Sequence, residues 1–214
     1  CNWWNKFTAT SGKEVRQGVK CDSDGRVIEL NLSYNGLKAN SIPEEIQFLA
    51  KMETLHLYNN PNLSGYIPEV FRKMPNLKGI GIMNTAMGGT LPQWIGTMTQ
   101  LTTLALSNND FYGSVPPSIQ NLKNLKLLAL DGNHFAGDVA TFKDLTKLEG
   151  LFLDHNALLG SISAFENLSN LISLDVSHNH LYGTLPVGLL NHPTLEVLDV
   201  SANSFDGKFP DDIL

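Results

Sequence analysis

One spacing, Leu-x-x-Leu-x-Leu-x-x-Asn, recurs along most of the chain and constrains its fold more than any other feature. A clear copy runs from Leu101 to Asn109, and successive copies begin 23 to 25 residues apart. These copies account for much of the excess of leucine and asparagine, which number 33 and 21 among 214 residues. Because one short copy cannot bury its apolar face alone, neighbouring copies must stack into a solenoid with one continuous core. The copies begin at Val27, Met52, Leu77, Leu101, Leu125, Leu148, Leu171 and Leu195.

Each recurring position of the repeat has a physical reason. The Leu-x-Leu alternation has the period of a short strand with its leucines on one face. The asparagine turns the chain out of that strand, and its amide can bond backbone groups of the neighbouring turn that would otherwise be buried unpaired. We expect parallel strands centred near residues 29–32, 54–57, 79–82, 103–106, 127–130, 150–153, 173–176 and 197–200. The expected asparagine ladder is Asn35, Asn60, Asn109, Asn133, Asn156, Asn179 and Asn203, with Thr85 in the third copy.

A second motif, Leu-x-Gly-x-Ile-Pro, follows the asparagine in several copies. With it, the sequence resembles the plant-type extracellular leucine-rich-repeat family, which includes receptor-like ectodomains and polygalacturonase-inhibitor-like proteins. The resemblance implies an α/β repeat protein, a right-handed solenoid with a concave parallel β-sheet. It also implies a second short strand after the turn and short helical or 3-10 segments on the convex side. The motif occurs at residues 63–68, 87–92, 111–116, 181–186 and 205–210.

Four copies depart from this pattern. The first and second each carry one extra residue, near Ala39-Asn40 and at Pro61-Asn62. The fifth and sixth have Ala140 and Ser163 where proline is expected, and each is one residue shorter. We expect a shorter convex segment and a changed curvature there.

The two ends of the sequence differ from the repeats. Residues 1–26 do not follow the spacing, and their aromatic residues suit a lid over the first coil. Their order of residues resembles the N-terminal cap of the family, which implies a disulfide between Cys1 and Cys21 and an oxidising compartment; two free thiols are the alternative. Residues 27–214 form eight repeats, of which the last is incomplete and carries no C-terminal cap. We therefore expect the natural polypeptide to continue beyond Leu214. The aromatic residues are Trp3, Trp4 and Phe7.

Three Asn-x-Ser/Thr sequons occur, at Asn31, Asn62 and Asn167. Asn62 falls in a loop insertion and Asn167 on the convex side, so both positions can carry a glycan. Asn31 falls on the first strand, where a glycan would obstruct the concave face.

Charge and motifs disfavour several classes of function. The net charge of −6 disfavours nucleic acid and anionic membranes as partners, and no apolar run is long enough to span a bilayer. The sequence lacks the phosphate-loop, zinc-protease and nucleophile-elbow motifs, so we expect no enzyme, no cofactor and no metal site. Asp22-Ser-Asp24-Gly25 lacks the later ligands of a calcium loop and indicates a hairpin turn.

The residues between the strand leucines are expected to face solvent on the concave side, where they form the candidate binding surface. An aromatic side chain beside acids and histidines favours ligand recognition in the later repeats. The acidic side chains are also concentrated in the later repeats. Residues 1–107 carry 10 basic and 8 acidic side chains, whereas residues 108–214 carry 5 basic and 13 acidic ones. The main candidates are Asp131, Phe152, Asp154, His155, Asp175 and His178, although Asp175 also matches the family consensus. The alternative group is Tyr34, His56 and Tyr58.

Together these features predict an extracellular or cell-surface recognition module that binds a protein, peptide or glycan through its concave face, as a fragment of a larger receptor-like or secreted protein. The alternative is a structural or adhesive subunit of a wall or cell-surface assembly. Ice binding is a third function known on similar scaffolds, but the sequence has no regular threonine or asparagine column beyond the ladder.

Overall fold

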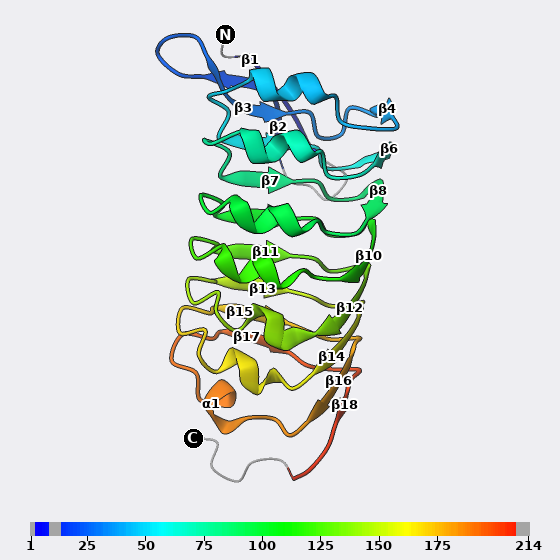
Figure 1. Ribbon diagram of the computed structural model, residues 1–214, viewed down its shortest axis with the longest axis vertical. Coiled ribbons are helices and arrows are strands. Elements are labelled where there is room, and N and C mark those ends of the chain that lie inside the picture. Colours follow the sequence, from blue (N-terminus) through cyan, green and yellow to red (C-terminus); the bar gives the residue numbers. More distant parts are fainter. Residues whose placement is uncertain (1–2, 9–13, 209–214) are drawn as a thin grey trace.

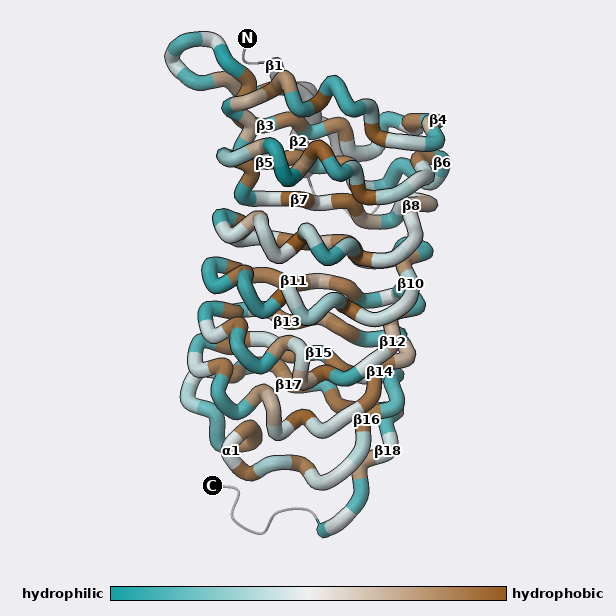
Figure 2. The backbone as a smooth tube through the Cα atoms, in the orientation of Figure 1, coloured by the Kyte–Doolittle hydropathy of each residue, from teal (hydrophilic) through white to brown (hydrophobic). Residues whose placement is uncertain are grey.

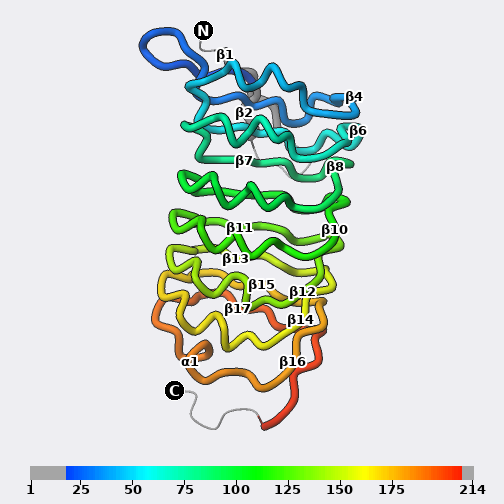
Figure 3. The backbone as a smooth tube through the Cα atoms, in the orientation of Figure 1, coloured from blue at the N-terminus to red at the C-terminus, as the bar shows by residue number. Residues whose placement is uncertain are grey.

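The computed structural model describes residues 3–8 and 14–208 and forms one elongated solenoid, which coils once per repeat (Figure 1). Successive repeats follow one another along its long axis without crossing, as the colours of Figure 3 show. Each repeat contributes one strand to each of two sheets, and each of the first seven repeats contributes one short helical segment to the convex side. This is the solenoid that the sequence predicts.

The first sheet, here called the concave sheet, has ten strands in the order β1-β2-β3-β5-β7-β9-β11-β13-β15-β17. From β3 onward every neighbouring pair is parallel, which confirms the predicted strands. The first two strands instead pair antiparallel with each other and with β3. The bounds are β1 Trp3–Thr8, β2 Glu14–Cys21, β3 Val27–Asn31, β5 Thr54–His56, β7 Gly79–Gly81, β9 Thr103–Ala105, β11 Leu127–Ala129, β13 Gly150–Phe152, β15 Ser173–Asp175 and β17 Val197–Asp199.

The antiparallel hairpin at the start extends the concave sheet by two strands. The turn that joins β2 to β3 closes with a hydrogen bond from the Asp22 N–H to the Arg26 carbonyl (2.9 Å), which confirms the predicted hairpin turn. Cys21 is 8% exposed and is not a free thiol. The expected lid residues lie in β1, and their side chains, like Cys1, fall outside the part of the chain that the structure describes.

The second sheet, here called the lateral sheet, has eight parallel strands along the other edge of the solenoid. Its strands are the second short strands that the resemblance implies. The extra residue at Pro61-Asn62 is absorbed as an irregularity in the pairing of β6 with β8. The bounds are β4 Lys38–Ala39, β6 Asn60–Gly65, β8 Thr85–Gly89, β10 Asp110–Ser114, β12 His134–Asp138, β14 Ala157–Gly160, β16 His180–Gly183 and β18 Ser204–Phe205.

Short helical segments cover the convex side. Proline precedes most of them, and its fixed φ sets the entry of the chain without a side-chain cap. The two repeats that lack this proline use Asp138 and Ser161 instead, whose side chains accept the backbone N–H groups of Ala140 and Ser163. Among the described residues no helix is long and apolar enough to cross a bilayer. The segments are η1 Glu44–Phe48, η2 Glu69–Lys73, η3 Gln93–Thr97, η4 Pro117–Asn121, η5 Val139–Phe142, η6 Ile162–Phe165 and α1 Val187–Leu190.

One apolar core runs through the stacked repeats between the two sheets and the convex segments. The inward-facing strand residues of the second to seventh repeats are almost completely buried, and the rings of Phe111 and Phe135 from successive repeats stack with centroids 6.2 Å apart. Figure 2 shows apolar residues recurring at the same place in successive turns. The core therefore continues from one repeat to the next.

The asparagine ladder joins each repeat to the one before it. Asn133 is 5% exposed, and its Nδ2 donates to the carbonyls of Leu106 (2.9 Å), Leu130 (3.0 Å) and Asp131 (3.1 Å), while its Oδ1 accepts the Phe111 N–H (3.1 Å). The same pattern recurs in other repeats. In the third repeat, the Thr85 hydroxyl bonds Asn109 Oδ1 instead. The asparagines with this pattern are Asn60, Asn109, Asn156, Asn179 and Asn203, whereas Asn35 is exposed.

Asn133→Ala is expected to lower the free energy of unfolding by about 1–3 kcal/mol, because buried backbone groups lose their partner. Urea unfolding followed by far-UV circular dichroism measures the change. Asn121→Ala, at an exposed position of η4, is the control and should change stability by no more than about 0.5 kcal/mol. Equal stability of the two variants would show that the ladder contributes nothing at this repeat.

Candidate functional site

The outward residues of the concave sheet stand in straight columns, because its parallel strands pair without a shift from β3 to β17. Neighbouring strands lie about 4.8 Å apart, so each column is a continuous surface. One column is Glu29, Thr54, Gly79, Thr103, Leu127, Gly150, Ser173 and Val197; the next is Asn31, His56, Gly81, Ala105, Ala129, Phe152, Asp175 and Asp199. None of the binding residues predicted from the sequence lies in the first of these columns.

The middle of the concave sheet carries only small side chains in the second column. Gly81, Ala105 and Ala129 occupy consecutive strands and are buried, the two alanines being 3% and 6% exposed. Larger side chains stand on both sides of them along the solenoid. These three residues, called here the floor, therefore form a low strip between two raised groups. The expectation that every residue between the strand leucines faces solvent is wrong for this strip.

The raised group on the C-terminal side of the floor, here called the acidic wall, consists of Asp131, Phe152, Asp154 and Asp175. All four are half-buried. Asp131 Oδ1 accepts the hydroxyl of Ser107 at 2.5 Å. Burial raises the pKa of the Asp131 carboxyl, the Ser107 hydrogen bond opposes this, and the charges of Asp154 and Asp175 raise the pKa further. The predicted acidic residues thus act on one another electrostatically.

Phe152 lies along the concave surface. A Cβ added to Gly150 would be 3.1 Å from its ring and 3.0 Å from Leu127 Cδ1, so the glycine leaves room for the ring beside the floor. The ring is half-buried, whereas the sequence predicts an exposed one. One part of the ring remains accessible to a ligand.

Asp175 also has a structural partner, because its Oδ1 accepts the backbone N–H of Ser177 at 3.0 Å. Asn31 and Asp199, in the same column, accept the N–H of Ser33 and Ser201 in the same way. This recurring bond gives the consensus residue a local role that is independent of any ligand.

The two predicted histidines project from a sharp corner after the strands. His155 and His178 have φ of 51° and 52°, and the corresponding residue of every repeat also has positive φ. This left-handed conformation favours glycine and asparagine, which occur there in four of the eight repeats. The two imidazole rings are exposed and stack 4.2 Å apart, and Asp154 Oδ2 lies 2.9 Å from His155 Nδ1. The remaining residues of this column are Tyr34, Asn59, Asn84, Asn108, Gly132 and Ala202.

The raised group on the N-terminal side, here called the aromatic wall, consists of Glu29, His56 and Tyr58. His56 Nδ1 lies 2.8 Å from the Tyr58 hydroxyl, and a Cβ on Gly81 would be 2.2 Å from that hydroxyl, so Tyr58 lies across Gly81. Burial lowers the pKa of His56, which the charge of Glu29 opposes; burial and Glu29 both raise the pKa of Tyr58. Tyr34, the third residue of the alternative group, projects from the left-handed corner and is 37% exposed.

A small hollow lies beside the aromatic wall. Its volume is about 230 Å³, and Thr54, Gly79, Gly81 and Thr103 line it together with His56. The two glycines lie in β7, where Gly79 borders Thr54 and Gly81 lies under Tyr58. The period-two alternation of the strands was the signal that would have identified Glu29 and Gly79 from the sequence.

The three sequons differ in accessibility. Asn62 in β6 and Asn167 after η6 are exposed, whereas Asn31 is half-buried. No group of three or more potential metal ligands occurs among the residues that the structure describes.

Comparison with known proteins relates this architecture to one family. A family model described as leucine rich repeat matches residues 138–181, and a second with the same description matches residues 100–122 and 194–214. No curated protein matches the chain. The matched segments lie in the repeats that carry the floor and the acidic wall, and at the C-terminal end.

Solved structures extend the likeness over most of the chain. The plant peptide hormone receptor RGFR1, in complex with RGF2, is 31% identical over 81% of this chain and 28% of that chain, with a TM-score of 0.76. The Arabidopsis receptor kinase HAESA, in complex with the peptide hormone IDA and the co-receptor SERK1, is 26% identical over 90% and 37%, with a TM-score of 0.71. A plant ice-binding protein is 25% identical over 90% and 78%, with a TM-score of 0.59. The chain thus spans less than two fifths of either receptor structure.

Asp131→Asn is expected to stabilise the fold at neutral pH. The raised pKa means that ionisation of this carboxyl disfavours the folded state, and the amide oxygen can still accept the Ser107 hydroxyl. The stabilisation should be present above the raised pKa and should disappear as the pH falls below the ordinary value of 3.8, because both states are then protonated. Thermal unfolding between pH 3 and 8 tests this, with the exposed Asp206→Asn as control. An identical pH dependence in both variants would contradict the electrostatic coupling.

Proposed function

Because the chain belongs to the plant-type leucine-rich-repeat family, we propose that it is a recognition module that binds an extended peptide or protein segment across its concave sheet. The proposal assigns it no catalytic step. The floor between its two walls is the observation that carries this proposal. Ala105 and Ala129 carry small side chains that do not rise above the sheet, so a bound segment can pass over them, whereas the Tyr58 ring covers Gly81.

The dimensions of the concave face suit an extended segment. Four strand spacings separate β5 of the aromatic wall from β13 of the acidic wall, a distance of roughly 19 Å. An extended chain covers this with about six residues. Peptide-hormone complexes of the similar receptors RGFR1 and HAESA support a peptide as the ligand class.

The acidic wall gives the ligand a direction. Asp131, Asp154 and Asp175 concentrate negative charge beside the Phe152 ring, so the matching end of the ligand carries a lysine or arginine next to an apolar side chain. The aromatic wall has a single carboxylate, Glu29, and beside it offers the His56 ring and the Tyr58 hydroxyl. The two ends of the site therefore differ in chemistry and can fix the direction in which the ligand chain binds.

The proposed site can be tested with peptides selected from a random twelve-residue phage library on the immobilised protein. Ala129→Trp places a bulky ring on the floor and should weaken the selected peptides at least tenfold by calorimetry. Ala136→Trp makes the same change on the lateral sheet and should leave binding unchanged. Phe152→Ala should weaken binding by roughly 1–3 kcal/mol, and salt should slow association.

His56→Ala distinguishes the two walls in the same assay. Peptides that depend on His56 and tolerate Phe152→Ala would move the main contact to the aromatic wall. Peptides that tolerate Ala129→Trp, or no peptide enriched over an unrelated solenoid, would contradict binding across the floor.

We also propose that the chain works outside the cell, with a Cys1–Cys21 disulfide and glycans on Asn62 and Asn167. The absence of a free thiol at Cys21 supports the disulfide, and the exposure of both asparagines supports the glycans. The asparagines stand on the lateral and convex sides, away from the floor, so glycans there leave the ligand site open.

Intact-mass measurement of protein from its native source tests this placement. We expect one disulfide that reductant opens, and a loss of mass on enzymatic deglycosylation that Asn62→Gln and Asn167→Gln together abolish. The control is Asn76→Gln, which lies outside any sequon. Two free thiols and an unmodified mass would place the protein in a reducing compartment.

A further inference from the structure

A second hollow lies on the outer face of the lateral sheet, away from the concave sheet. Its volume is about 380 Å³, at the small end of the range for small-molecule sites. The central strand β8 contributes its base through Ala86, Gly88 and Gly89, while Tyr66 and Tyr112 come from the two sides. No role proposed for the concave face uses these residues.

The glycines of β8 create the hollow. A Cβ on Gly89 would lie 2.4 Å from Cδ1 of Tyr66, so the tyrosine ring rests directly on the glycine backbone. A Cβ on Gly88 would lie 2.6 Å from the carbonyl oxygen of Asp110 on the next strand. Gly88 is not the recurring glycine of the repeat, because Gly89 occupies that position in β8. The repeat alone therefore does not explain the second glycine.

Two tyrosine rings beside the hollow are accessible to solvent. Tyr66 is 72% exposed and Tyr112 is 53% exposed, so neither ring belongs to the core. One strand lies between them, which separates their strands by roughly 10 Å. The Tyr66 ring covers Gly89, whereas Ala86 is exposed and Gly88 half-buried, so the base is open at these two residues and can hold a ring-shaped ligand between the tyrosines.

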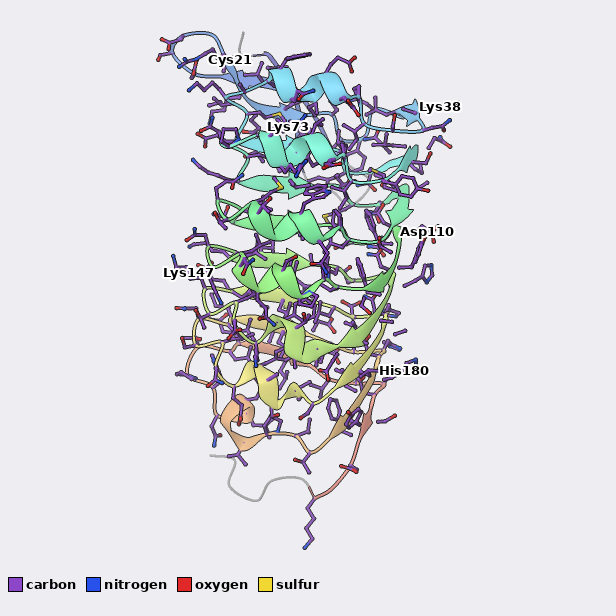
Figure 4. All side chains as sticks on the ribbon, in the orientation of Figure 1. Cys21, Lys38, Lys73, Asp110, Lys147 and His180 are labelled. Carbon is purple, nitrogen blue, oxygen red and sulfur yellow. The ribbon has the colours of Figure 1, made fainter. Side chains whose placement is uncertain are left out.

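The rim of the hollow is polar. Ser64 Oγ lies 3.4 Å from Asn40 Oδ1, which places a hydroxyl and an amide together. Asp110 adds a largely exposed carboxylate, one oxygen of which lies 3.2 Å from His134 Nε2. Asp110 projects on the side of the lateral sheet, as does His180 farther along (Figure 4). The rim thus offers both donors and acceptors around the two rings.

We propose that this hollow binds one neutral sugar residue of a glycan. A pyranose presents a C–H face that packs on the negative face of an aromatic ring, and hydroxyl groups that both donate and accept hydrogen bonds. The tyrosines match the first property, and Asn40, Ser64 and Asp110 match the second. The Asp110 carboxylate and the net charge of −6 disfavour an anionic sugar.

The test uses neutral oligosaccharides of defined linkage, namely cellopentaose, laminaripentaose, mannopentaose and xylopentaose, with trigalacturonate as the anionic probe. Saturation-transfer NMR and calorimetry at millimolar concentrations measure binding. At least one neutral probe should bind the wild-type protein, and Tyr66→Ala and Tyr112→Ala should each weaken it fivefold or more. Tyr182→Ala is the matched control, because Tyr182 takes the place of Tyr112 in a later repeat and is also 53% exposed; it should bind as the wild type does.

Three outcomes would overturn the proposal. These are no binding of any neutral probe, preference for trigalacturonate, and binding that survives the Tyr66→Ala/Tyr112→Ala double variant with an unchanged circular dichroism spectrum. The peptides selected on the concave face provide a separate check. If the double variant loses those peptides, the hollow belongs to a peptide site and the sugar assignment is wrong, whereas failure of the peptide selection leaves the sugar test unaffected.

Discussion

The asparagine amides hold the repeats in register, and the rest of the structure depends on that register. Each Nδ2 bonds a carbonyl of its own repeat and a carbonyl of the repeat before it, as Asn156 does with Leu153 and Leu130. Because these carbonyls lie beside the core, an apolar side chain in this place would leave them buried without a partner. Straight columns on the concave sheet and a regular lateral sheet both follow from this fixed relation between neighbours.

The corner that follows each strand limits which side chains the site can display. A positive φ there favours glycine and asparagine, so a histidine, tyrosine or alanine carries a conformational cost. His155 and His178 occupy this corner beside the acidic wall, with their rings stacked. The ring contact and the pairing of His155 with Asp154 offset part of that cost.

The repeat period made the core, the strands and the ladder predictable from the sequence, because each follows from local alternation and stacking. Residues such as Leu128 and Asn133 could be assigned in this way. The floor was not predicted, because the burial of Ala105 and Ala129 depends on side chains of neighbouring turns. The half-buried Phe152 ring is a similar case, since its place depends on Gly150. The lateral hollow depends on Gly88, a residue outside the recurring pattern.

The columns of the concave sheet also fix the distances between its outward side chains. Corresponding outward positions of the concave sheet lie a whole number of strand spacings from one another, and the ladder prevents one repeat from sliding past the next. A ligand that engages both walls must therefore have its two anchoring groups at one separation, and a segment one residue shorter misses the second anchor by about 3.3 Å. On the proposed site, the stacked architecture would discriminate ligands by length as well as by chemistry, and an added or deleted repeat would change the accepted length by one strand spacing.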